Sequence, residues 1–417
     1  MSRTHVVGAG LAGLAAAVRL VRAGRAVTVH EAGGRAGGRC RSYVDAKLDC
    51  LIDNGNHLLL SGNRSAMRYL ADIGARNVLV GPAMARFPFL DLRTGLRWEV
   101  RPNPGRLPWW ILRADRRVPG TNARSYLSAL RLALADPDRT VSDCVGGYGA
   151  LFERFWEPLA VAALNTPART GAARLLRPVL LETFARGEES CRPRIASLGL
   201  SHAFVDPALE FLERHGATVR LGRRLREVDY TDGRASRLAF VGETVSLHGG
   251  DRVILAVPPS AAAALVPSLS VPEGSNTIVN VHFRLSEPAR LPPDLPFLGL
   301  VGGTAQWIFV RGDVVSITIS AADDLAAVPA DDIARKTWND VASALSLNRH
   351  ALPVHRVVKE RRATFAQTPD EIRRRPGNRS GFANVYLAGD WIDTGLPATI
   401  EGAIRSGHMA ARAAGGS

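Results

Sequence analysis

The sequence is poor in cysteine, and this scarcity excludes two classes of protein. Its 417 residues include four cysteines, none in a CxxC pair, so a disulfide-framework protein is excluded and free thiols in a reducing cytosol are expected. No histidine stands at metal-ligand spacing from a cysteine, and we expect no metal site. The four are Cys40, Cys50, Cys144 and Cys191.

Long apolar runs are also missing. The apolar run at 11–18 is broken by Arg19 and Arg22, which does not suit a signal peptide. The longest uncharged run, 253–272, contains four prolines and predicts a buried strand, a turn and a short helix rather than a membrane span. We therefore expect a cytoplasmic protein.

Lysine is nearly absent although the chain is basic. Lysine and arginine together number 53 against 39 acidic residues, a formal net charge of +14, but the only lysines are Lys47, Lys336 and Lys359. Arginine in place of lysine throughout is typical of a genome-wide coding bias. The arginine-rich spots are short, scattered and not interleaved with aromatic residues, so we expect no nucleic-acid partner. Attraction to anionic lipid stays open.

What is present is the composition and patterning of a large α/β protein. Hydrophobic residues make up 46% and charged residues 22% of the chain, as in ordinary globular proteins. Strand and helix patterns predict a Rossmann-type cofactor domain assembled from 1–80, 205–275 and 380–417. The intervening stretches 81–204 and 276–379 predict an inserted substrate domain of mixed α+β structure.

The first thirty residues carry a dinucleotide-binding pattern. Gly8-Ala9-Gly10-Leu11-Ala12-Gly13 stands between a predicted strand and a predicted helix, and Glu31 ends the next strand. The first glycine permits a tight turn, the second lets the backbone approach a pyrophosphate, and the third lets the helix pack on the strand. The helix N-terminus attracts phosphate. Glu31 is placed to accept hydrogen bonds from a ribose, and its charge disfavours the 2′-phosphate of NADP.

Two further motifs favour FAD over NAD. The stretch 31–39 is rich in glycine and ends in Arg39, which predicts a second loop over the pyrophosphate, absent from simple NAD dehydrogenases. Near the other end, Gly389 and Asp390 close a strand, and 395–403 opens the last helix. Asp390 can bind a ribityl hydroxyl, and the helix N-terminus near Ile400 can point its dipole at a flavin ring.

Together with Asp53-Asn54-Gly55-Asn56-His57, these motifs resemble the amine oxidase and phytoene desaturase superfamily of FAD flavoproteins. Within it, the stretches 53–58, 155–159, 163–167 and 389–402 are similar to the hydroxysqualene dehydroxylases, the squalene-associated branch. The resemblance covers nearly the whole chain. It implies an amine oxidase-like fold, non-covalent FAD and a long-chain isoprenoid substrate. The implied reaction is reductive removal of an allylic hydroxyl, which converts hydroxysqualene to squalene.

The motifs and the resemblance together give an expected site. The expected FAD contacts are Gly8, Gly10, Ala12, Gly13, Glu31, Ala32, Gly38, Arg39, Asn56, His57, Leu225, Gly389, Asp390, Thr399 and Ile400. The residues expected around the substrate are Asn54, Trp156, Leu164, Asn165, Trp391 and Pro397. A plain core role is equally open for Trp156. The departing oxygen needs an acid, for which His57 and Asp393 are the candidates, and a structural role of His57 stays open.

Three other functions stay open: an FAD-dependent polyisoprenoid desaturase, which runs the reverse chemistry, an amine oxidase, and a lipid-binding protein without activity. The amine oxidase is disfavoured because no aromatic pair is evident around a flavin-facing lysine. The electron donor and the oligomeric state are left open as well.

Because a C30 hydrocarbon is effectively insoluble, the implied substrate predicts peripheral docking on the inner membrane. The best candidate segment is 104–113, which contains Trp109 and Trp110 and is followed by Arg116 and Arg117. Tryptophan suits the membrane interface and arginine pairs with lipid phosphate. A core role for both tryptophans is equally open.

Overall fold

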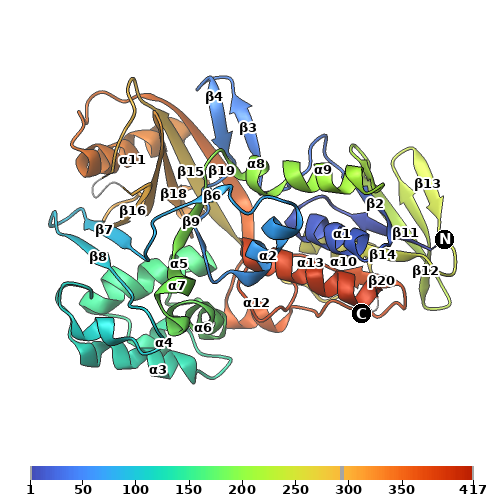
Figure 1. The fold of residues 1–417 in the computed structure, drawn as a ribbon, viewed down its shortest axis with the longest axis horizontal. Coiled ribbons are helices and arrows are strands. Elements are labelled where there is room, and N and C mark those ends of the chain that lie inside the picture. Colours follow the sequence, from blue (N-terminus) through green and yellow to red (C-terminus); the bar gives the residue numbers. More distant parts are fainter. Residues whose placement is uncertain (1, 292–294, 416–417) are drawn as a thin grey trace.

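The computed structural model describes residues 2–291 and 295–415, which form two layered bodies side by side (Figure 1). The first body is built on a five-stranded, fully parallel sheet of strand order β10-β2-β1-β14-β20. Its strands are β1 (Arg3–Val7), β2 (Ala26–His30), β10 (Thr218–Arg220), β14 (Arg252–Leu255) and β20 (Val385–Leu387). The chain therefore enters this sheet three times.

Two helices cover this sheet because their residues are small enough to approach closely. Helix α1 (Leu11–Arg22) is rich in alanine and buried along most of its length. Helix α13 (Ile400–Gly415) lies against it and presents Gly407, where an added Cβ would stand 2.1 Å from the carbonyl oxygen of Ala12. Only a glycine at this position permits the contact, and the pair of helices brings the last motif beside the first.

The second body contains a seven-stranded mixed sheet of order β19-β15-β18-β17-β16-β7-β8. Helix α11 (Ala330–Leu345) packs on its outer face through an apolar cluster that includes Phe283 and Trp338 (Figure 1). Its strands are β7 (Phe87–Asp91), β8 (Arg97–Val100), β15 (Ser275–Arg284), β16 (Phe297–Val301), β17 (Trp307–Arg311), β18 (Val314–Ile319) and β19 (Val354–Phe365).

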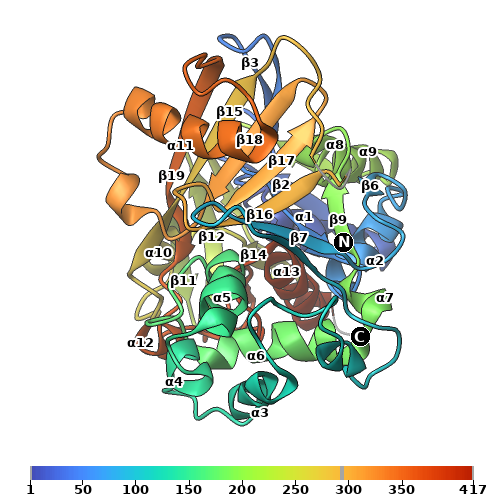
Figure 2. The same cartoon turned by 90° about the vertical axis from the view of Figure 1, so that its left-hand side faces the viewer.

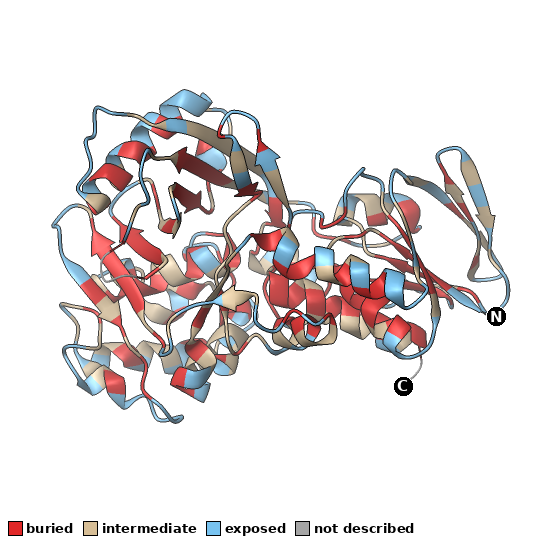
Figure 3. Ribbon diagram, turned by 45° about the horizontal axis from the view of Figure 1, so that its top comes forward, coloured by how far each residue is buried: buried red, intermediate tan, exposed pale blue. Residues whose placement is uncertain are grey.

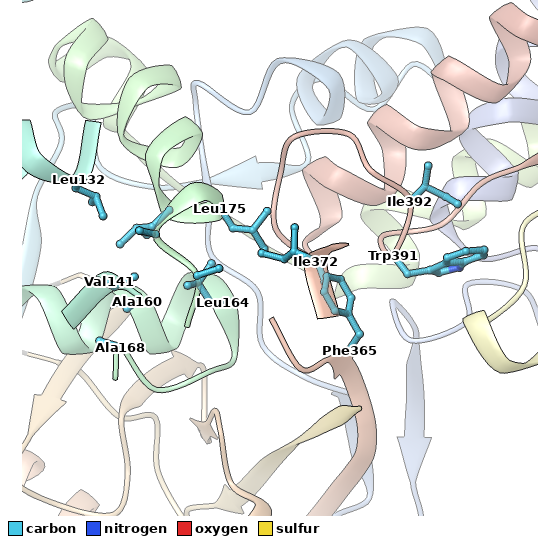
Figure 4. Packing of buried hydrophobic residues seen from close by; sticks show 14 of the residues in the cluster. Leu132, Val141, Ala160, Leu164, Ala168, Leu175, Phe365, Ile372, Trp391 and Ile392 are labelled. Carbon is cyan, nitrogen blue, oxygen red and sulfur yellow. The ribbon is translucent and has the colours of Figure 1, made fainter. Parts of the chain in front are cut away.

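A group of short helices lies below this sheet, as Figure 2 shows. They share one large apolar core with parts of both sheets, in which Leu164, Leu175 and Phe365 lie together (Figure 4). The elements are η1 (Trp109–Leu112), η2 (Ala123–Leu127), α3 (Ser128–Ala133), α4 (Val141–Val145), η3 (Phe152–Trp156), α5 (Glu157–Leu164), α6 (Ala173–Glu182), η4 (Phe184–Arg186) and α7 (Glu188–Cys191).

Smaller elements complete the molecule, and Figure 3 shows buried residues inside both bodies and exposed residues on outer helix faces and turns. The remaining strands are β3 (Ser42–Asp45), β4 (Cys50–Asp53), β5 (Leu59–Leu60), β6 (Leu79–Val80), β9 (Pro193–Ala196), β11 (Leu225–Thr231), β12 (Arg234–Phe240) and β13 (Glu243–Ser246). The remaining helices are α2 (Arg64–Asp72), α8 (Leu200–Phe204), α9 (Asp206–Arg214), α10 (Pro259–Leu265), η5 (Asp323–Leu325) and α12 (Pro369–Arg373). Within residues 2–291 and 295–415, no helix has the length and apolarity needed to cross a bilayer.

The α/β class predicted from the sequence agrees with this architecture, and the elements around the glycine motifs lie where they are expected. Helix α6 ends at Glu182, and Thr183 has a non-helical backbone before the short 3-10 helix η4. The long strand β19 and the antiparallel sheet β11-β12-β13 are not among the predicted elements.

Candidate active site

A continuous cavity of about 1530 Å³ takes its walls from both bodies. One end is lined by the loops that follow β1, β2 and β20, and the other by the inner face of the seven-stranded sheet. Typical small-molecule pockets measure roughly 300–1,000 Å³. The cavity therefore has room for two occupants, a large cofactor and a separate substrate.

The glycines of the first motif divide their roles as the sequence predicts. At Gly13 an added Cβ would stand 1.9 Å from the carbonyl oxygen of Gly8, so this glycine lets α1 pack against β1. At Gly10 an added Cβ would meet no protein atom within 4 Å and would point into open space. Gly10 lines the cavity and Gly13 does not. Gly10 therefore leaves space that a ligand can occupy, whereas Gly13 is needed for the packing of α1 against β1.

Glu31 joins the two glycine loops. One carboxylate oxygen accepts the backbone N–H of Ala9 at 2.8 Å, and the other accepts that of Gly33 at 2.7 Å. The amide of Gly37 also donates to the carbonyl of Ala9 at 2.8 Å. Because each carboxylate oxygen has a second lone pair, Glu31 can still accept a ribose hydroxyl on the cavity side.

Arg39 and Asp390 link the glycine loop to the late motif. Their nearest atoms, Arg39 Nη2 and Asp390 Oδ1, lie 2.8 Å apart, and Arg39 also donates to the carbonyl of Ala363. The neighbouring carboxylate raises the pKa of Arg39 further above its ordinary value. The Arg39 side chain is 47% exposed, and it is part of the cavity wall. The pair thus presents both a cation and an anion to a ligand.

Arg375 fixes the loop that follows Asp390. This buried guanidinium donates to the carbonyls of Asp390 and Trp391 at 3.2 Å, to that of Leu396 at 2.9 Å, and to that of Ile392. Burial lowers the pKa of Arg375 to about 10, so it remains charged at neutral pH. Four carbonyls around one cation hold the loop rigidly beneath the cavity.

The loop between β4 and β5 reaches the centre of the cavity and is tied to the substrate sheet. Asn280 Nδ2 donates to the carbonyl of Asn54 at 3.3 Å, and Thr318 Oγ1 donates to Asn280 Oδ1 at 2.8 Å. Asn56 Nδ2 in turn donates to Thr318 Oγ1 at 3.1 Å. The side chain of Asn54 bonds to the neighbouring strand β19, where its Nδ2 donates to Glu360 Oε2 at 3.3 Å. These five residues form one connected polar network on the cavity wall.

His57 lies next to this network and also lines the cavity. Burial lowers the pKa of His57 to about 4. The imidazole is therefore neutral at pH 7 and can donate or accept one hydrogen bond at each of its two nitrogens. A neutral histidine does not store the proton that a departing hydroxyl needs.

The inner face of the seven-stranded sheet changes from polar to aromatic across its width. β15 and β18 present Asn280 and Thr318 to the cavity, whereas β17 presents Trp307 and Phe309. Farther across, Phe89 of β7 continues the aromatic side. The cavity thus offers polar contacts at one end of this face and apolar contacts at the other.

Most of the residues predicted from the sequence line the cavity. On the cofactor side they are Gly8, Gly10, Ala12, Glu31, Ala32, Gly38, Arg39, Asn56, His57, Leu225, Gly389, Asp390, Thr399 and Ile400. On the substrate side they are Asn54, Asn165, Trp391 and Pro397.

Three expected substrate or acid residues lie elsewhere. Trp156 and Leu164 are buried in the apolar core behind the cavity wall, and Leu164 is seen among its core neighbours in Figure 4. Phe155 and Leu159, on the same helical segment, line the cavity instead. Asp393 is outside the cavity wall, where its carboxylate lies 3.4 Å from Arg174.

Three polar residues of the cavity wall are absent from the sequence-based set: Asn280, Thr318 and Glu360. All three lie on strands of the substrate sheet and reach the cavity through strand pairing. For Asn280 and Thr318 the only signal in the sequence is a polar residue in a mostly apolar strand, which is too common to indicate a site, and for Glu360 the charged sequence of β19 gives no signal.

Comparisons with known proteins agree with this geometry. Residues 11–414 match the sequence model of a family described as flavin containing amine oxidoreductase. The chain is 44% identical over 411 residues to the hydroxysqualene dehydroxylase of Zymomonas mobilis, covering 99% of this chain and 98% of the relative. It is 45% identical over 413 residues to that of Rhodopseudomonas palustris, with the same coverage. A probable zeta-carotene desaturase of Synechococcus elongatus is 24% identical, covering 99% of this chain and 98% of the relative.

Solved structures show the same fold at low sequence identity. The structure of a putative protoporphyrinogen oxidase from Exiguobacterium gives a TM-score of 0.70 at 18% identity and covers 99% of this chain and 98% of that one. Cyclohexylamine oxidase from Brevibacterium oxydans gives a TM-score of 0.72 at 14% identity with the same coverage.

Proposed function

The chain belongs to the hydroxysqualene dehydroxylases, a family of flavin-containing amine oxidoreductases, and from this membership we propose that it converts hydroxysqualene to squalene by replacing the hydroxyl group with hydrogen. The observation that carries the proposal is the likeness to these relatives along almost the entire chain. The sequence identity to the carotene desaturase is 24%, compared with 44% to the Zymomonas relative, and both alignments cover 99% of this chain. The dehydroxylation is therefore favoured over the desaturation.

We propose that the flavin is FAD, held by a domain made of residues 1–80, 205–275 and 380–417, while 81–204 and 276–379 form the substrate domain. The residues present fit this cofactor. The open space over Gly10 can take a pyrophosphate, Glu31 can take the adenosine ribose, and the Arg39–Asp390 pair can take the ribityl chain and phosphate. When bound and reduced, FAD supplies a hydride to the substrate.

We propose that FAD is bound without a covalent bond. Of the four cysteines, Cys40 alone lines the cavity, and burial raises the pKa of its thiol far above the ordinary value. A protonated thiol is a poor nucleophile toward the flavin ring. Acid precipitation of the yellow protein should leave the colour in the supernatant, and colour in the washed pellet would contradict this proposal.

The protein's own residues then divide the work of dehydroxylation. The aromatic side of the sheet, with Trp307 and Phe309, binds the hydrocarbon and excludes water that would recapture an allylic cation. The polar side, with Asn280 and Thr318, binds the hydroxyl end of the substrate. Neutral His57 orients polar groups between the two sides.

The direction of the reaction is tested with photoreduced protein and hydroxysqualene under anaerobic conditions. We expect squalene by gas chromatography and mass spectrometry, together with return of the oxidised flavin spectrum. Flavin reoxidation without squalene, or desaturation of a polyisoprenoid that depends on oxygen, would refute the proposal in favour of a desaturase.

We also propose that the protein docks on the cytoplasmic side of an anionic inner membrane, through a patch that we name the leucine surface. Its members come from η1, η2 and α3 and the residues beside them, and each side chain is exposed. They are Leu107 (79%), Trp109 (44%), Leu112 (68%), Leu127 (59%), Leu130 (61%) and Leu134 (84%). Trp110, by contrast, is 6% exposed and packs edge-on against Tyr126, so only one of the two adjacent tryptophans faces outward.

Charge and position support this docking. Residues 101–140 contain eight arginines and three aspartates, and the guanidinium of Arg116 lies 5.0 Å from the centre of the Trp109 ring. Such a basic, tryptophan-bearing surface suits anionic headgroups. Helix α3 packs against α6, whose residues Val179 and Glu182 line the cavity. Docking here therefore brings the lipid close to the substrate cavity.

The docking proposal is tested by flotation with vesicles that contain anionic lipid. The variant Trp109→Ser/Leu130→Ser is expected to load flavin but to remain in the dense fraction. Leu221→Ser, which removes a 45% exposed leucine from the opposite body, is the matched control and should float like wild type. Unchanged flotation of the double variant would refute the leucine surface as the docking site.

A further inference from the structure

The dehydroxylation needs a proton donor beside the departing oxygen, and the cavity wall contains six carboxylates from which it can come. They are Glu31, Glu182, Glu273, Glu360, Asp390 and Glu401. Their hydrogen-bond and ion-pair partners differ, and these partners separate one carboxylate from the other five.

Five of the six are held by strong donors. Glu31 accepts two backbone N–H groups, and an arginine that is paired with a carboxylate stabilises its ionised form. The ion pairs are Asp390 with Arg39 at 2.8 Å, Glu182 and Glu401 with Arg405 at 2.6 and 3.1 Å, and Glu273 with Arg374 at 2.5 Å. These five carboxylates are therefore already engaged by backbone amides or by arginines.

Glu360 differs from the other five. Glu360 Oε2 accepts a hydrogen bond from the neutral amide Nδ2 of Asn54 at 3.3 Å. The Glu360 carboxylate forms no ion pair with any residue in the described ranges. Strand pairing places it opposite Ile278, two residues before Asn280, so it shares the cavity-facing side of the sheet with the polar network. Arg39 and Arg362 also line the cavity, but neither forms an ion pair with Glu360.

The two acid candidates from the sequence differ from Glu360 in charge or in position. His57 is neutral at pH 7 because burial lowers its pKa to about 4. Asp393 lies outside the cavity wall and is paired with Arg174. Glu360 is thus the cavity carboxylate that lies beside the polar network without an ion-pair partner in the described ranges.

We propose that Glu360 is the general acid of the dehydroxylation, an inference that rests on the proposed function. Its carboxyl proton passes to the hydroxyl oxygen of the substrate, the carbon–oxygen bond breaks with its electron pair on oxygen, and water leaves. The carbon then accepts the hydride and its electron pair from the reduced cofactor, and the Glu360 carboxylate regains a proton from solvent. Asn54 and Asn280 are positioning residues, because they fix the carboxyl and the loop beside it.

The test compares wild type, Glu360→Gln and the control Glu227→Gln, an exposed glutamate on β11. In single-turnover reactions of reduced, flavin-loaded protein with hydroxysqualene, Glu360→Gln should slow squalene formation by about 10²–10⁴-fold. The decline of the wild-type rate at high pH should disappear in this variant. Substrate binding, followed by the change in the oxidised flavin spectrum, should be retained. The control should match wild type in all three measurements.

Each other outcome counts against a specific statement. If wild type forms no squalene, the proposed function fails and the role of Glu360 with it. If wild type is active and Glu360→Gln lies within tenfold of it, or keeps the decline at high pH, only the general acid is refuted. If Glu360→Gln fails to load flavin, the Glu360→Ala variant is assayed with and without added formate. A rate of squalene formation that formate restores supports Glu360 as the general acid, and a rate that formate does not change refutes it.

Discussion

Replacing Glu31 tests whether the adenosine end of the cofactor lies where the two glycine loops meet. Its carboxylate oxygens accept the amides of Ala9 and Gly33, which belong to different loops. Glu31→Ala removes the acceptor of both amides together with the ligand of the ribose. Glu31→Gln keeps one acceptor but turns an N–H donor toward the other amide, so we expect it to be nearly as harmful as alanine.

The size of the effect follows from the charge of the acceptor. A hydrogen bond to a charged group is worth about 1.5–3 kcal/mol, and every 1.4 kcal/mol is tenfold in affinity. The Kd for FAD should therefore rise by roughly 10–150-fold in Glu31→Ala. Part of the loss is expected to come from loosened loops rather than from the ribose itself.

The assay is titration of the apoprotein with FAD, followed by quenching of flavin fluorescence. FMN lacks the adenosine ribose, so its affinity should change less than that of FAD in the same variant. Glu227→Gln, at an exposed position of β11 outside the cavity wall, controls for the loss of a negative charge. An FAD affinity within twofold of wild type in Glu31→Ala would refute the assignment of this end of the cavity.

Other predictions separate the fold from the cofactor site. Gly13→Ala places a Cβ against a backbone carbonyl and should destabilise the apoprotein in urea, whereas Gly10→Ala should leave its stability near wild type and weaken FAD binding. Arg375→Met leaves four buried carbonyls without their donor and should cost at least about 3 kcal/mol of unfolding free energy, with loss of flavin; an unchanged urea midpoint would contradict this. The buried imidazoles His30 and His282 have pKa values lowered to about 4 from 6.5, so the unfolded state takes up protons first as pH falls. The stability each contributes is fully present above pH 6.5 and is lost toward pH 4, by roughly 3 kcal/mol each; a Tm that is constant between pH 7 and 4.5 would refute this.

The cofactor end of the molecule could be predicted from the sequence because its signals are local. Gly8, Gly10 and Gly13 lie within one turn and one helix start, and Glu31 follows after a single strand. Each of these positions has a backbone or charge requirement that few residue types meet. The structure adds that Gly10 faces the open cavity and that Gly13 lies at the contact between α1 and β1.

The substrate end could not be predicted in the same way because its residues meet through long-range strand pairing. Asn280 and Glu360 come from β15 and β19, whose register brings them to one face. The sequence of β19 is crowded with arginine and lysine, which hides its strand character. Family likeness favours Leu164 as a pocket residue and leaves a core role equally open for Trp156, because the face that a helix turns inward depends on packing that no local motif records.

The sheet order β10-β2-β1-β14-β20 has a consequence for synthesis of the chain on the ribosome. β1 is made first, yet its neighbour β14 follows only after some 250 residues, and β20 and α13 complete this body last. Until then the apolar side of α1 against which α13 packs has no partner, and Asp390 has not joined Arg39. We therefore expect the proposed FAD to be retained only when nearly the whole chain has emerged. Nascent chains stalled before residue 389 should be colourless and depend on chaperones, because their longest-lived exposed surface is the one that the final helix covers.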